Sequence, residues 1–180
     1  VYEDQQTLLT ATGQSAVYTF LVPAAGQPAK VTLVWSDSAG AAGASPALVN
    51  NLDLVVVSGG VTYRGNVFSS GWSTSGGTAD TLNNLENVYI QSPGSDLTIT
   101  VSATAVNGDG VPYNGDATDQ DFALVCSNCA EQAGFTLAVT PSTLSVCAPA
   151  DAVFAVEVGS VMGFTDPVDL AASGNPAGTT

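Results

Sequence analysis

Two kinds of side chain are nearly missing from this sequence. It contains no histidine, and Lys30 and Arg64 are its only basic residues. Without an imidazole, the chain cannot assemble an Asp-His-Ser triad, in which histidine is the general base. A Ser–Lys dyad would need Lys30, which begins a predicted strand with no Gly-x-Ser elbow nearby. The sequence therefore predicts that this chain is not an enzyme.

Positive charge and long apolar runs are also scarce. Sixteen acidic residues face the two basic ones, which gives a net charge of −14. Nucleic acids and anionic membranes both require Lys or Arg on the contact face, so the charge excludes them as partners. No apolar run reaches the length of a membrane span, and Val1–Asp4 does not read as a signal peptide. With no initiator Met and a Ser/Thr/Asn/Gly-rich surface, the sequence predicts a fragment of an exported, extracellular protein.

The three cysteines leave several kinds of site open. Cys126 and Cys129 have C-x-x-C spacing, which occurs in redox motifs, zinc sites and small structural disulfide loops. A redox motif would open a helix, and a zinc site would need two more ligands, whereas the chain has one further cysteine, Cys147, and no histidine. We expect a structural disulfide between Cys126 and Cys129.

Alternation of apolar and polar residues dominates the chain, and no segment shows a helical period. In the stretch 48–57, Leu52, Leu54 and Val56 share one face of an extended strand, and Asn51 and Asp53 share the other. The density of Leu and Val predicts a central strand. The turn after it, Ser58-Gly-Gly, predicts a hairpin with 61–64. The predicted core consists of Leu33, Trp35, Leu52, Leu54, Val88, Ile90, Ile99 and Val101.

The composition changes near residue 127. We expect an all-β chain, with a jelly-roll or β-sandwich domain over residues 1–126. A linker at 127–134 is followed by a partial immunoglobulin-like β-sandwich over 135–180, with strands at 135–141, 152–159 and 167–171. Three strands are too few for a sandwich. The segment is therefore expected either to self-associate by strand pairing with another chain or to fold back on the first domain.

Five motifs in register over about residues 5–126 carry a resemblance to a known family. They are Trp35-x-Asp37, Leu48-Val-Asn-Asn-Leu-Asp-Leu-Val55, Tyr63-Arg-Gly-Asn66, Asp80-x-x-Asn-Asn-x-Glu-Asn-Val88 and Phe122-Ala-Leu124. This part of the chain resembles the C-terminal β-barrel that follows the catalytic domain in alkaline, kexin-like subtilisin proteases. The family usually has Asp where this chain has Asn51, and the loop 107–121 is longer than in the family.

The resemblance implies a function without catalysis. It predicts an accessory domain of a secreted subtilisin-like serine protease, which stabilises the parent enzyme and has its catalytic domain as partner. The alternative is an extracellular interaction or assembly module built from β-domains.

The family motifs also supply oxygen ligands that suit Ca²⁺. These are Asp37, Asn51, Asp53, Asp80, Asn84 and Glu86. The equally weighted alternative is that these side chains cap turns and strand ends through backbone N–H groups.

Two polar loops complete the candidates. The acidic loop 107–121 contains Asp109, Asp116, Asp119 and Asp121, and it lacks the twelfth-position glutamate of an EF-hand, so solvated carboxylates are expected. Trp72, in a Ser/Gly-rich loop, is either a stacking platform for a sugar or peptide or, more commonly, a cover for one end of the barrel.

Overall fold

A computed structural model describes residues 1–147, 150–161, 164–171 and 173 of the chain. Within these residues the secondary structure is entirely β, with no helix. The chain separates into two compact units, Val1–Gln132 and Ala133–Thr180. The predicted all-β class is confirmed.

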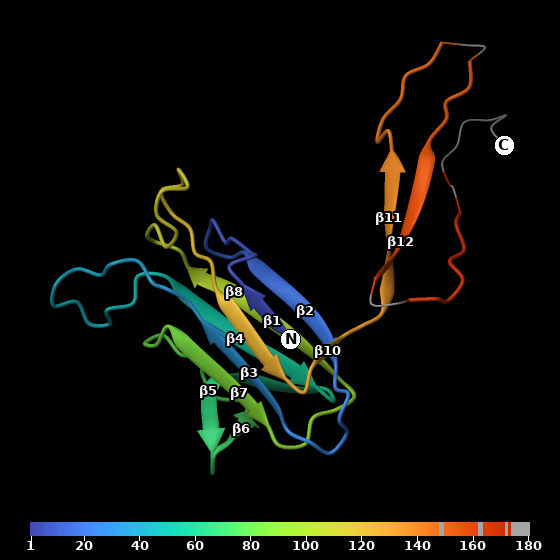
Figure 1. Ribbon diagram of the computed structural model, residues 1–180. Coiled ribbons are helices and arrows are strands. Elements are labelled where there is room, and N and C mark those ends of the chain that lie inside the picture. The colour runs from blue at the N-terminus through green and yellow to red at the C-terminus, as the bar shows by residue number, and fades with distance from the viewer. Residues whose placement is uncertain (148–149, 162–163, 172, 174–180) are drawn as a thin grey trace. The chain divides into compact units, whose positions relative to one another are not determined.

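Ten strands of the first unit form two antiparallel sheets (Figure 1). The four-stranded sheet has the order β1 (Tyr2–Asp4), β9 (Ala123–Ser127), β3 (Ala29–Val34) and β7 (Leu85–Ile90). The six-stranded sheet has the order β10 (Ala130–Glu131), β2 (Ser15–Leu21), β8 (Asp96–Ala105), β4 (Asn51–Ser58), β5 (Val61–Ser69) and β6 (Trp72–Ser75).

The strand order is that of a jelly roll. The chain changes sheet from β1 to β2, from β2 to β3 and from β3 to β4, and β7, β8 and β9 again alternate between the sheets. Two interleaved Greek keys of eight strands produce this order. The short strands β6 and β10 extend the second sheet at its two edges.

The core lies between the two sheets, where the inward residues of each strand meet. All eight predicted core residues are at most 3 % exposed, which confirms the strand faces read from the sequence. β4 lies between β8 and β5, and its residues alternate between half-buried and buried. The predicted central strand is therefore confirmed, as is the hairpin, in which Ser58 pairs with Val61.

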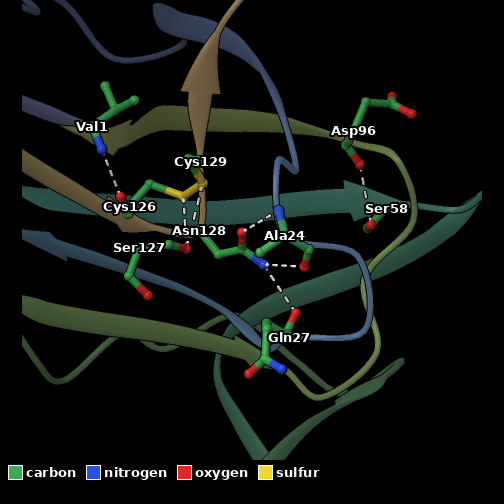
Figure 2. The surroundings of a disulfide bond; sticks show 9 residues. All are labelled: Val1, Ala24, Gln27, Ser58, Asp96, Cys126, Ser127, Asn128 and Cys129. Atoms are coloured by element: carbon green, nitrogen blue, oxygen red, sulfur yellow. Dashed lines mark hydrogen bonds between the residues drawn. A yellow bond between two sulfur atoms is a disulfide. The ribbon is translucent and has the colours of Figure 1, made fainter.

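A disulfide marks the corner at which the chain leaves β9 for the other sheet. Cys126 and Cys129 are joined, with their Cα atoms 5.7 Å apart. Between them Asn128 has a left-handed backbone (φ 57°), and its side chain bonds three main-chain atoms of the turn 24–27 (Figure 2). The C-x-x-C loop is thus built into the fold.

The first unit extends beyond the expected boundary at residue 126. Ala130 and Glu131 pair with Leu21 and Phe20, so these two residues of the predicted linker belong to the second sheet as strand β10. Residues 130–131 can form a strand because β2 pairs with β8 on one side and has no other neighbour than β10 on the other side.

The second unit contains one hairpin, β11 (Gly134–Thr140) paired with β12 (Ala155–Val161). The predicted strand at 167–171 is wrong: these residues are described and form no strand. In the described residues both hairpin strands pair only with each other. A strand exists only with a ladder partner, and residues 167–171 have none.

Candidate metal centre around Glu86

Glu86 is a carboxylate buried between the two sheets. It lies on β7 on the same face as Val88 and Ile90, and it is 1 % exposed. Its Oε2 accepts a hydrogen bond of 2.7 Å from the backbone N–H of Leu54 on β4. Its Oε1 is buried and has no hydrogen-bond partner among the described residues.

The Glu86 carboxylate lies beside the point where the hydrogen-bonded pairing of β4 with β5 ends. The pairing of these strands ends at Val55 and Arg64, so the N–H of Leu54 is satisfied by Glu86. Gly65 makes the space, because a Cβ there would lie 2.7 Å from Cδ and 2.8 Å from Cβ of Glu86. A glycine in a strand often marks such a close approach.

Asn51 and Asp53 come from the outward face of β4. The Nδ2 of Asn51 donates to Oδ1 of Asp53 over 3.3 Å. The other side-chain atom, Oδ1 of Asn51, is buried and without a partner in the described structure. The predicted common orientation of these two residues is therefore observed.

Asp80 lies near these groups, but both of its carboxylate oxygens already accept hydrogen bonds from protein groups. Its two oxygens accept bonds from the side chains of Asn66 and Asn83 and from the N–H groups of Leu82 and Asn83. Burial alone would raise the pKa of Asp80, but these hydrogen bonds together lower it. Asp80 therefore contributes a fixed negative charge and holds Asn66 in place.

The electrostatics of the cluster disfavour three negative charges. Burial, together with the charges of Asp53 and Asp80, raises the pKa of Glu86 to about 8, although the hydrogen bond from Leu54 acts in the opposite direction. Burial also raises the pKa of Asp53, although Thr104, Asn51 and Arg64 act in the opposite direction. A cation or a proton would relieve this repulsion.

Two of the six predicted ligands bind main chain elsewhere. Both oxygens of Asp37 accept backbone N–H groups, from Val49 and Asn50, at 2.7 Å. The Nδ2 of Asn84 donates to the carbonyl of Trp35 over 2.8 Å. Asp37, like Asp80, accepts backbone N–H groups, as the alternative reading of the motifs expects, whereas Asn84 donates to a main-chain carbonyl.

The remaining residues fit a Ca²⁺ ion through mixed oxygen ligands. In the described parts of the chain, no three carboxylate, thiolate or imidazole groups gather closely enough to chelate a metal by themselves. The orphaned atoms, Glu86 Oε1 and Asn51 Oδ1, are both oxygen acceptors; Asn51 bonds the Asp53 carboxylate, and the charge of Asp53 acts on Glu86. Ca²⁺ accepts such amide and carboxylate oxygens and completes its shell with water or backbone carbonyls.

Replacing Gly65 by Ala should disrupt this arrangement. The new Cβ would overlap the Glu86 side chain, whose own Cβ is fixed by the strand, so we expect a loss of about 1–3 kcal/mol in the free energy of unfolding. Chemical denaturation measures the loss. At Gly134, where a Cβ meets nothing within 4 Å, the same change should have an effect of less than about 0.5 kcal/mol. Equal effects at both positions would refute the close approach.

Sequence reasoning missed a second buried polar cluster, centred on Asn50. The side chain of Asn50 makes five hydrogen bonds, to 107, 108, 119 and 120, and the residue is fully buried. Gln120 is also fully buried and continues the cluster to the carbonyl of Ser36. No spacing signals these contacts, because the partners are up to 70 residues apart.

The expectation of a solvated acidic loop is wrong for two of its four aspartates. Asp119 is fully buried, and its Oδ1 accepts the N–H groups of Gly110 and Val111. Asp121 is 9 % exposed. The loop folds around Asp119 because a carboxylate can satisfy several main-chain donors at once. Asp116 remains exposed, as expected.

Trp72 is half-buried in β6.

In the part of the chain that the structure describes, no helix has the length and apolarity needed to cross a membrane. A scan against protein-family models finds no match for the chain, and no curated protein matches its sequence.

Proposed function

We propose that the first unit, Val1–Gln132, is a non-catalytic accessory module whose fold is stabilised by one Ca²⁺ ion at Glu86. Asn51, Asp53 and Glu86 hold the ion, and Asp80 positions Asn66 beside it. Bound calcium neutralises the buried carboxylate and links the two sheets at one point, β4 on one side and β7 on the other.

The observation that carries this proposal is the pair of orphaned oxygens. A buried acceptor without a donor costs about 1–3 kcal/mol, and Glu86 Oε1 and Asn51 Oδ1 are both buried acceptors without a partner in the described structure. Backbone N–H groups cannot satisfy them, because the only donor reaching Glu86 in the described structure is Leu54, at the other oxygen. A cation satisfies both atoms together.

The role in a protease follows from the resemblance of residues 5–126 to the barrel of kexin-like subtilisins. A chain without histidine would support such an enzyme by bracing its catalytic domain outside the cell. The gene upstream of the Val1 codon tests this role. It should encode a subtilisin-like catalytic domain with a Gly-Thr-Ser-x-Ala segment, and an unrelated upstream sequence would refute the protease role while leaving the calcium site untouched.

Removing calcium should lower the melting temperature. A ligand that binds only the folded state stabilises it by about 2.7 kcal/mol at 100 times its Kd. At about 4 °C per kcal/mol, the melting temperature should fall by about 10 °C on adding excess chelator. Calorimetry in 10 mM CaCl₂ and in EDTA measures this fall. Mg²⁺ at the same concentration should restore little of it, because Mg²⁺ demands near-ideal octahedral geometry.

Without calcium, stability should depend on pH in a defined direction. The folded protein holds a proton on Glu86 up to about pH 8, whereas the unfolded chain loses it near 4.5. The unfolding free energy is therefore highest below pH 4.5 with respect to this group, and it falls as the pH rises towards 8. Melting curves in EDTA at pH 5, 6, 7 and 8 should show this decline. The variant Glu86→Gln should show a weaker decline, and an equal one would exclude Glu86 as its source.

Self-association is a second candidate function, which the hairpin of the second unit favours. The register of β11 and β12 places Phe135, Leu137 and Val139 on the same face as Val156 and Val158. All five are 41–53 % exposed, and the face carries no charge. The opposite face carries Thr136, Thr140 and Glu157. An amphipathic pair of strands is unstable alone. Leu170 and Ala171 lie beside this face but leave its apolar side chains exposed, so the apolar face of a second copy can cover them without charge repulsion.

Sedimentation velocity tests the self-association. The chain should form dimers as its concentration rises, and Leu137→Lys should keep it monomeric. Thr136→Lys, on the polar face of the same strand, is the matched control and should still dimerise. A wild-type chain that stays monomeric at high micromolar concentration would rule out this function.

A further inference from the structure

A cavity of about 140 Å³ opens at the start of β9, away from the Glu86 cluster in sequence and in lining residues. Val34, Trp35 and Phe122 form its apolar wall, and Asp4 and Asp121 bring two carboxylates to it. Gln5, at the rim, has a left-handed backbone (φ 52°), which is uncommon for a residue with a side chain.

Asp121 is buried in this wall without a counter-charge. The residue is 9 % exposed, and of the groups that act on its pKa only its own backbone N–H favours the ionised form. Burial raises its pKa, and the charges of Asp119 and Asp4 add to the rise. An ionised carboxylate in such a place is costly unless a positive group pairs with it.

The chain itself cannot provide that positive group. Its only two basic residues are Lys30 and Arg64. The ammonium group of Lys30 lies 5.0 Å from the centre of the Tyr89 ring, and Arg64 acts on Asp53. Neither residue lines the cavity. A positive group that pairs with Asp121 would therefore be supplied by another molecule.

We propose that this cavity receives a lysine or arginine side chain of a partner protein. The aliphatic stem packs against Trp35, Val34 and Phe122, and the cationic end pairs with Asp121 and Asp4. Lys and Arg bury their stems along apolar surface in this way while their charge meets a polar group. The cavity has about five times the ~30 Å³ share of one water molecule, which suits one long side chain.

A metal ion fits this cavity less well than a basic side chain does. Ca²⁺ needs six to eight oxygen ligands, and the wall offers two carboxylates beside the apolar side chains of Val34, Trp35 and Phe122. The proposal is independent of the calcium site and of the protease role, since it uses different residues and a different ligand.

NMR titration of the ¹⁵N-labelled chain with n-butylguanidinium and n-butylammonium chloride tests the proposal. Both probes carry the stem and the charge of the expected side chain. We expect saturable shifts of the amides of Gln5, Ser36 and Phe122, and at least a tenfold weaker affinity in Asp121→Asn. The matched control Asp116→Asn removes the same charge from an exposed site and should bind as the wild type does.

Three results would overturn the proposal. They are the absence of saturable shifts, equal affinity in Asp121→Asn, and saturation of the same amides by CaCl₂ but not by the organic cations. If Asp121→Asn loses the dispersed spectrum of a folded protein, Asp4→Asn replaces it, because Asp4 is exposed and contributes to the same cavity. Its affinity should then fall, and an unchanged value would count against the site.

Discussion

Asn50→Ala should destabilise the first unit by about 3–5 kcal/mol, one of the largest effects of any single substitution in this chain. The side chain accepts the N–H groups of Asn107 and Gly108 at 2.7 and 2.9 Å. It also donates to the carbonyls of Gly108 and Asp119 and to Oε1 of Gln120. An alanine leaves these buried groups without partners, and each orphaned group costs about 1–3 kcal/mol.

Equilibrium unfolding in urea measures this loss. Asn107→Ala is the matched control, because Asn107 is exposed and its amide makes one bond, of 3.1 Å, to the carbonyl of Val49. Its effect should stay below about 1 kcal/mol. A small effect for Asn50→Ala, similar to that of the control, would mean that water replaces the lost bonds and that the loop 107–121 is not anchored by this side chain.

Leu54→Ala should cost about 2–5 kcal/mol, because it removes a 1 %-exposed side chain from the centre of the core. Leu54 lies on β4, between β8 and β5, where the inward residues of both sheets meet. The surrounding strands are paired on both sides, so they can move little to fill the cavity that the alanine would leave.

The same urea titration measures this effect. Val17→Ala, at a position that is 61 % exposed on β2, should change the unfolding free energy by less than about 0.5 kcal/mol. The slope of the unfolding free energy against urea should be the same in wild type and both variants. A loss below about 1 kcal/mol for Leu54→Ala would contradict a close-packed core.

The fold was predictable from the sequence because a strand buries every second residue. In the sequence, Leu52, Leu54 and Val56 occupy every second position of the strand. In the structure these three residues are buried and the residues between them are half-buried. The hairpin was predictable too, since Gly59 and Gly60 both adopt positive φ in the turn. These signals are local. The pairing of β3 with both β7 and β9, by contrast, left no local pattern.

The candidate site was only partly predictable, because a motif fixes residue type but not hydrogen-bond partners. Asn51 and Asp53 share a face, as their spacing requires. Asp37 has the same chemistry, yet two main-chain N–H groups occupy its oxygens. Asp121 was misjudged as solvated, because its burial depends on the cavity wall contributed by distant strands.

The second unit shows the limit of strand propensity. Residues 167–171 have the composition of a strand, but they form none. Leu170 and Ala171 instead line an apolar cavity of about 380 Å³ with Leu137, Val139 and Val156. The segment lies beside the apolar face of the hairpin and pairs with neither of its strands.

Calcium binding by the whole chain is the most direct test of the account. Isothermal titration calorimetry of the metal-free protein should give one Ca²⁺ per chain, with a Kd of about 10⁻⁴ M at neutral pH, and the heat should depend on the buffer because Glu86 releases its proton. Glu86→Gln should abolish the binding, and Asp116→Asn should retain it. A wild-type chain that binds no Ca²⁺, or a Glu86→Gln variant that binds it equally well, would contradict the proposed centre and leave a shared proton as the reason for the buried carboxylate.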